Sequence, residues 1–218
     1  MTVSDPALQS ADTTVLAQEG RCSWYGGGFH GQRTSNGERF DQKSLTAAHP
    51  SLPFGTNVEV TALETGKTVR VRINDRGPFT QQRVLDVSYA AACSLGITGR
   101  GVAKVALKVV DDENLKWPSA VSALQVASFP NKAQAESFLA AMTAEQKATA
   151  LYYIKPTATS AHSFTVRFGP FAGDDMARTV AARLKRRGLH PELVAEDFGN
   201  GTVLANNASG DRDGSAKR

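Results

Sequence analysis

The sequence predicts two small domains, an all-β barrel followed by an α+β sandwich. In the first half, apolar and polar residues alternate at period two between glycine-containing turns, which is typical of the strands of a small barrel. The second half repeats one pattern, an alternating strand followed by an amphipathic helix. Residues 111–119, which are charged and then contain a proline, form the predicted linker. With 218 residues, the chain is long enough for both domains.

Residues 21–110 form the predicted barrel domain. Its clearest strands are residues 57–63, 67–75 and 102–110. The first two of these are joined through ETGK, a glycine-containing hairpin turn. The segment SYAAACSLGI (88–97) predicts a short helix that ends at Gly96.

Residues 120–195 form the predicted sandwich and contain an internal repeat. The segment ALQVASFPNKAQAESFLAAM (123–142) aligns with TVRFGPFAGDDMARTVAARL (165–184), so that Ala135 matches Ala177. A further strand after each helix gives the order β-α-β-β-α-β. This order predicts a ferredoxin-like sandwich.

Composition and charge exclude several classes of protein. The formal net charge is only +4, without a Lys/Arg run that interleaves with aromatic residues, so no nucleic-acid partner is expected. No segment reaches the ~18 apolar residues of a transmembrane helix. The histidines lack metal-ligand spacing, and we expect neither a metal nor a cofactor. Cys22 and Cys93 fit one disulfide or two buried thiols. The polar ends, residues 1–20 and 196–218, are expected to be disordered.

The stretch WYGGGFHGQRTSNGERFD (24–41) contains the G-x-G-x-x-G spacing of a dinucleotide-binding loop. Such a loop requires a helix that begins at its last glycine. Here Asn36 and Gly37 follow as a turn signal, which argues against that helix. The alternative is a glycine-rich turn that is needed only for its backbone geometry.

Acidic and histidine side chains lie among the turns of the predicted barrel, at Glu38, Asp41, His49 and Asp75. Asp75 ends a strand in RINDRGPF, where the following turn holds its carboxylate in place. Cleavage of a glycosidic bond needs an acid and often a second carboxylate. These residues therefore form either a sugar-cleaving site or a set of solvated surface groups. Asp86 is either a further site acid or a strand-end residue that bonds the next helix.

Three motifs, C-SWYG-x₂-FHG-x₂-TSNGERFD, TAAHPSLPFGTNVEVT and VRINDRGPF, resemble the RlpA family (rare lipoprotein A) over residues 21–110. The resemblance implies a six-stranded double-psi β-barrel, related to barwin and expansins. It also implies a lytic transglycosylase that cleaves MurNAc–GlcNAc bonds of peptide-free (denuded) peptidoglycan strands without water and leaves 1,6-anhydro ends. The alternatives are a non-catalytic, expansin-like protein that binds cell-wall glycan, and a two-carboxylate hydrolase.

By motif position, the resemblance implies a catalytic set of Asp41, Glu38, His49 and Asp75. Asp41 is the expected general acid/base. Asp75 and His49 would orient or charge it, and Glu38 would assist. Three aromatic residues of the first motif either stack on sugar rings or pack under the loop. They are Trp24, Tyr25 and Phe29.

Residues 120–195 resemble a SPOR domain through LQVASF and VRFGPF. This resemblance implies binding of denuded glycan, with Gln125, Ser128 and Arg167 at motif positions of the glycan-binding sheet face. Period two directs Gln125 and Arg167 away from the helices. The aromatic and basic residues that usually precede VRFGPF are less well matched here, where Ser163, Phe164 and Thr165 stand.

Members of the RlpA family are exported, often as lipoproteins. The start of this sequence shows neither a signal peptide nor a lipobox cysteine. We expect a monomeric protein of the periplasm or cell envelope, located at the septum, whose export segment is absent from this sequence. Divisome proteins are its candidate partners.

Overall fold

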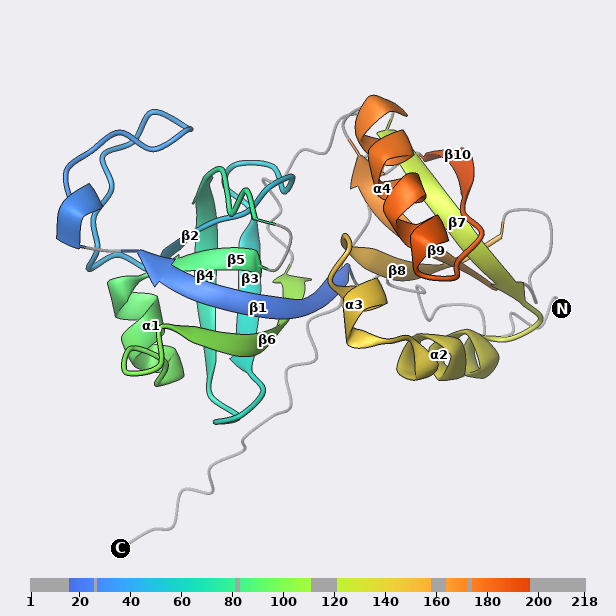
Figure 1. The fold of residues 1–218 in the computed structure, drawn as a ribbon, viewed down its shortest axis with the longest axis horizontal. Coiled ribbons are helices and arrows are strands. Elements are labelled where there is room, and N and C mark those ends of the chain that lie inside the picture. Colours follow the sequence, from blue (N-terminus) through green and yellow to red (C-terminus); the bar gives the residue numbers. More distant parts are fainter. Residues whose placement is uncertain are drawn as a thin grey trace, which may run out of the picture.

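The computed structural model describes residues 16–25, 27–80, 83–110, 121–157, 164–171 and 174–196. These residues form a barrel and, beside it, a smaller α+β domain (Figure 1). Both predicted folds are therefore confirmed. The predicted linker and most of the two predicted disordered ends lie outside the described residues.

Six strands close into the barrel: β1 (Ala17–Tyr25), β2 (Thr46–Ala48), β3 (Asn57–Ala62), β4 (Thr68–Asp75), β5 (Arg83–Ser88) and β6 (Val102–Val110). Strand β1 pairs in parallel with β5 and antiparallel with β6, and the ring closes through β2, β4 and β3. The β2–β4 pair is also parallel. The result is the mixed six-stranded barrel that the resemblance implied.

The predicted hairpin and short helix of the barrel are both present. Strands β3 and β4 alternate between buried and more exposed residues, as period two predicts. Helix α1 (Tyr89–Leu95) begins after Ser88, whose side chain accepts a hydrogen bond from the Ala91 amide. It ends at Gly96, which has the left-handed φ of 71° that favours glycine at this position.

The second domain has the predicted order, with one short additional helix. Its elements are β7 (Val121–Phe129), α2 (Lys132–Ala141), α3 (Ala144–Lys147), β8 (Tyr152–Pro156), β9 (Phe164–Phe171), α4 (Asp174–Arg186) and β10 (Glu192–Glu196). The strands lie in the order β10-β7-β9-β8. The buried face of α4, which includes Val180 and Leu184, packs in one core with Leu124 and Phe168 of the sheet.

Strand β1 also connects the barrel to the second domain (Figure 1). It begins at Ala17, earlier than the predicted start at Arg21, and Ala17 pairs with Tyr152 of β8. Glu19 forms an ion pair with Lys147 at 3.1 Å. Gln18 and Glu19 interrupt the apolar alternation of this strand because their side chains make polar contacts with the other domain. The sequence of one strand does not reveal such a contact.

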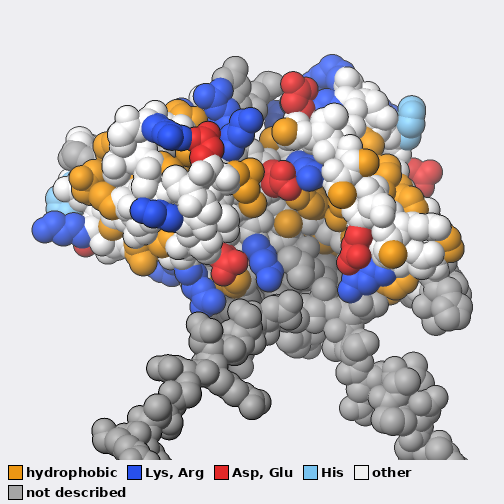
Figure 2. Space-filling model, turned by 90° about the horizontal axis from the view of Figure 1, so that it is seen from below, with side chains coloured by type: hydrophobic (Ala, Val, Ile, Leu, Met, Phe, Trp, Pro, Cys, Tyr) orange, Lys and Arg blue, Asp and Glu red, His pale blue; other side chains and the backbone are white. Residues whose placement is uncertain are grey.

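The described residues show neither a surface patch of one charge on the face of Figure 2 nor a disulfide. On the face seen in Figure 2, basic and acidic side chains are interspersed over the described residues. Cys22 is buried and Cys93 is exposed, and both are free thiols rather than a disulfide or two buried thiols. In the described part of the chain, no helix is long and apolar enough to span a membrane, and no His, Cys, Asp and Glu group is arranged to hold a metal ion.

Candidate active site

A cavity of about 430 Å³ lies on the barrel where β1 and β4 end and β5 begins. Its charged lining residues are Arg33, Asp75, Arg76, Arg83 and Asp86. Among the described lining residues, Asp75 is the one member of the predicted catalytic set. The cavity therefore combines two carboxylates with several arginines at the end of the barrel.

The loop that carries the glycine motif folds as a hairpin beside this cavity. Thr34 donates its amide to the Glu38 carbonyl at 2.8 Å, and Gly37 has a φ of 91° that a side chain would strain. The Asn36 amide donates to the carbonyl of Asn74 at 3.3 Å. The helix that a dinucleotide loop requires is replaced here by a three-residue 3₁₀ turn, Gly27–Phe29. The loop is therefore a turn that docks on the end of β4.

Asp75 is held by this loop through one of its two carboxylate oxygens. Its Oδ1 accepts hydrogen bonds from the Ser35 amide (2.9 Å), the Ser35 hydroxyl (2.5 Å) and the Arg76 amide (2.8 Å). No hydrogen bond to Oδ2 is found among the described residues. The carboxylate is thus fixed in orientation, while one oxygen stays available to a ligand in the cavity.

Glu38 anchors the loop to β4. Its carboxylate accepts two hydrogen bonds from the Arg72 guanidinium, at 2.8 and 2.9 Å, and one from the side-chain Nδ2 of Asn74 at 3.1 Å. These contacts, the Arg72 bonds above all, lower the pKa of Glu38 to about 2. Glu38 is therefore ionised at neutral pH and suits a positioning role better than that of an acid.

Substituting Glu38 with Gln is expected to lower kcat about 10-fold, because the loop that holds Asp75 loses one charge-assisted contact of ~1.5–3 kcal/mol. The matched control is Glu64→Gln, which removes an exposed ion pair with Arg100 at the far hairpin of the barrel. Steady-state rates of the glycan cleavage that the resemblance implies, measured for both variants, check this. Equal rates for both would contradict the positioning role of Glu38.

Asp41 lies on the loop surface, with its side chain 49% exposed. Its Oδ1 accepts the Lys43 amide at 2.9 Å and its Oδ2 the Ser44 hydroxyl at 3.1 Å. The Lys43 amide is the largest cause of the lowered pKa of Asp41. Asp41 thus closes a local turn outside the cavity, and its role as general acid stays a prediction.

His49 is buried, only 2% exposed, and both ring nitrogens are engaged. Its Nδ1 accepts the amides of Ser51 (3.2 Å) and Leu52 (3.0 Å), so the ring proton is on Nε2, which donates to Gln18 Oε1 at 3.0 Å. Burial, with a smaller effect of the Arg76 charge, lowers the pKa of His49 to about 3. The ring is therefore neutral. The His49 backbone amide donates a hydrogen bond to the Asp75 backbone carbonyl at 3.2 Å.

Asp86 lies in β5 on the wall of the same cavity as Asp75. It accepts the Ser23 hydroxyl at 2.6 Å and forms an ion pair with Arg83 at 3.0 Å. Ser88, not Asp86, caps the next helix. Of the two interpretations of Asp86, the structure therefore favours a place in the site.

The aromatic residues of the first motif divide between the cavity and the core. Tyr25 and Phe29 line the cavity, whereas Trp24 packs edge-on against Tyr89 at 5.4 Å between ring centroids. Neighbouring residues of β1 point to opposite faces, which separates Trp24 from Tyr25. Phe79 also lines the cavity and is 87% exposed.

A polar row crosses the helix-free face of the second domain. Arg167 donates to Gln125 Oε1 at 3.3 Å, and Gln125 donates to the Ser128 hydroxyl at 3.3 Å. Arg167 also pairs with the buried carboxylate of Glu196, which accepts the Tyr153 hydroxyl at 2.8 Å. The structure therefore brings the three predicted residues of this face together.

Comparison with known proteins agrees with both halves of the structure. The family model described as lytic transglycolase matches residues 17–107, and the SPOR domain model matches residues 119–195. The "Endolytic peptidoglycan transglycosylase RlpA" of Vibrio cholerae is 36% identical over 186 residues, which cover 82% of this chain and 69% of the relative. The chain belongs to the RlpA family of lytic transglycosylases.

Two further relatives show how much of the chain is similar to RlpA proteins. The Neisseria meningitidis (serogroup A) "Endolytic peptidoglycan transglycosylase RlpA" is 37% identical over 84% of this chain and 76% of its own length. A Synechocystis "Probable endolytic peptidoglycan transglycosylase RlpA" is 58% identical over 103 residues, which cover 47% of this chain. This chain spans 32% of that relative's length.

Two features of this RlpA chain were not singled out in the sequence. Phe79 stands in the quoted RINDRGPF motif, where an aromatic residue after Gly-Pro in a predicted turn was an available signal. Glu196 was assigned to the disordered tail, yet it ends β10 and is buried. Its pKa is lowered, because hydrogen bonds from Lys155, Arg167 and Tyr153 outweigh the opposing effect of burial.

Proposed function

We propose that this chain is an endolytic transglycosylase that cleaves MurNAc–GlcNAc bonds of peptide-free peptidoglycan strands to 1,6-anhydro ends. The SPOR domain would hold it on denuded glycan at the septum. The observation that carries the proposal is Asp75, whose carboxylate is oriented through Oδ1 and lines a cavity together with aromatic residues.

One carboxyl group accounts for the proton movements of this reaction. Asp75 protonates the glycosidic oxygen as the bond to the MurNAc anomeric carbon breaks. The MurNAc 6-hydroxyl then bonds to that carbon, and its proton returns to Asp75. No water is consumed, and the enzyme ends in its starting protonation state.

Two further cavity residues suit the intermediate charge and the substrate hydroxyls. Asp86, held by the Ser23 hydroxyl and by its ion pair with Arg83, places a second carboxylate on the wall of the cavity. The Tyr25 hydroxyl is buried next to the Thr46 side chain. Burial above all raises its pKa, so it stays protonated and can donate to a sugar hydroxyl.

The products formed from peptide-free strands in ¹⁸O-labelled water test this function. We expect fragments of many lengths with anhydro ends and no labelled oxygen. Labelled reducing ends would instead identify a hydrolase. Unchanged strand lengths, together with binding to denuded sacculi, would identify an expansin-like binding protein.

Substituting Phe79 with Ala is expected to raise KM for these strands about 10-fold, because covering a Phe side chain contributes ~1.5–3 kcal/mol. A change in kcat is not expected. Leu63→Ala, which shortens an exposed apolar side chain at the far hairpin, is the control. An unchanged KM for Phe79→Ala would remove this residue from the glycan site.

A further inference from the structure

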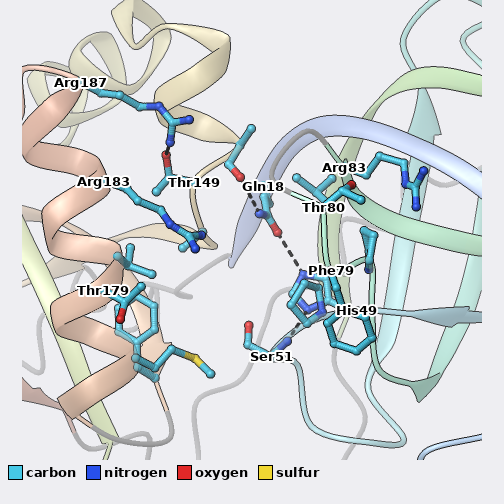
Figure 3. A pocket seen from close by; sticks show the side chains of 18 of the residues that line it. Gln18, His49, Ser51, Phe79, Thr80, Arg83, Thr149, Thr179, Arg183 and Arg187 are labelled. Carbon is cyan, nitrogen blue, oxygen red and sulfur yellow. Dashed lines mark hydrogen bonds between the residues drawn. The ribbon is translucent and has the colours of Figure 1, made fainter.

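A second cavity, of about 510 Å³, lies between the barrel and the SPOR domain (Figure 3). Its barrel wall includes Gln18 and His49, and its SPOR wall is formed largely by α4. Pockets of roughly 300–1,000 Å³ are typical of ligand sites. This wall of α4 is separate from the SPOR sheet face that carries Gln125 and Arg167.

The second cavity continues the one that holds Asp75. Four residues line both cavities: Pro78, Phe79, Thr80 and Arg83. Phe79 stands exposed at this junction. The two cavities are therefore neighbours, and a polymer bound at Asp75 can extend past Phe79 toward the SPOR domain.

Helix α4 presents a polar face to this path. Asp175, Thr179 and Arg183 recur at intervals of four residues and thus share one side of the helix. Figure 3 shows Thr179 and Arg183 directed from α4 toward the barrel, with Arg187 beyond them.

The arginines of this cavity differ in what they bind. Arg83 pairs with Asp86, and Arg187 donates to the Thr149 hydroxyl at 2.5 Å. Within the described residues, Arg183 has neither a hydrogen bond nor an ion pair. Its guanidinium is the cation that remains available to a ligand.

We propose that the interdomain cavity is a glycan subsite in which Arg183 binds the lactyl carboxylate of a muramic acid residue. The proposal rests on the proposed function. In a peptide-free strand this carboxylate is free and accepts two parallel hydrogen bonds from a guanidinium. In a peptide-bearing strand the same group is an uncharged amide. Arg183 therefore gives the enzyme its preference for denuded glycan.

The test compares peptide-free strands with the same strands after their lactyl carboxylates have been converted to methyl amides. For the free-carboxylate strands, Arg183→Ala is expected to raise KM about 10-fold or more and to leave kcat unchanged. For the amidated strands, wild type and Arg183→Ala should have equal KM values. Arg178→Ala, an exposed residue on another side of α4, is the matched control.

Binding to intact strands separates the two proposals. It is measured by calorimetry with Asp75→Asn and with Asp75→Asn/Arg183→Ala. If the wild type cleaves the strands but Arg183→Ala and Arg178→Ala have the same KM, the role of Arg183 is overturned and the proposed activity stands. If binding requires both the free carboxylate and Arg183 but the wild type does not cleave the strands, the subsite is supported and the proposed activity is overturned. Equal binding of free and amidated strands overturns the subsite.

Discussion

Replacing Asp75 with Asn is expected to lower the cleavage rate about 1,000-fold, within the ~10²–10⁴ that a positioned acid/base contributes. An Asn side chain keeps the size of Asp and an oxygen that can accept the bonds from Ser35 and the Arg76 amide. The loop should therefore stay docked while the proton transfer is lost. Mass spectrometry of the released anhydro ends measures the rate, and thermal unfolding checks that the fold is intact.

Asp41→Asn is the informative comparison for this result. Asp41 is exposed and bonded to its own turn, so we expect its substitution to change the rate only a few-fold. The motif-based prediction expects the reverse, with Asp41 as the acid. Loss of cleavage in Asp41→Asn together with an active Asp75→Asn would support Asp41 as the acid and contradict the role proposed for Asp75.

The second large effect is expected in stability, from His49. In the folded protein His49 has a pKa of about 3, whereas an exposed histidine titrates near 6.5. The unfolded chain therefore binds more protons between these values, so the free energy of unfolding falls as the pH is lowered through this window. Between pH 8 and pH 5 the expected loss is about 2 kcal/mol, at ~1.36 kcal/mol per pH unit.

Urea unfolding at pH 8 and pH 5 measures this loss, and His49→Ala should abolish it. That variant is also expected to be about 4 kcal/mol less stable at pH 8, because the Gln18 side chain and the Ser51 and Leu52 amides lose their partner. Leu63→Ala, at an exposed site without a titratable group, should keep the wild-type pH dependence. The carboxylate of Glu38 titrates at lower pH and does not enter this window. A stable, inactive His49→Ala with unchanged pH dependence would instead indicate a catalytic histidine.

Much of the barrel was predictable because its signals are local. Alternation at period two identified β3 and β4 with their hairpin, and the glycine signal identified the end of α1 at Gly96. The start of β1 and the burial of Glu196 were not predictable in this way. Both depend on contacts with distant residues, namely Lys147 for β1 and Arg167 for Glu196.

The candidate site was predicted only in part. The motifs identified Asp75, Tyr25 and Phe29, which the cavity brings together. They also grouped Glu38, Asp41 and His49 with Asp75, although the structure gives each of these three a different set of partners. Nearness in sequence does not specify which side of a loop a carboxylate faces, since that is decided by the strand on which the loop docks.

By itself, the sequence determined the two folds, their order, the family, and the loop and strand end where a site would lie. Only the tertiary structure decided which carboxylate lines a cavity, that the histidine is buried and neutral, and that Phe79 lines two cavities. The physical reason is that alternation and turn chemistry are properties of short segments. Burial, ion pairing and the lining of a cavity arise when segments such as 31–41, β4 and α4 are brought together.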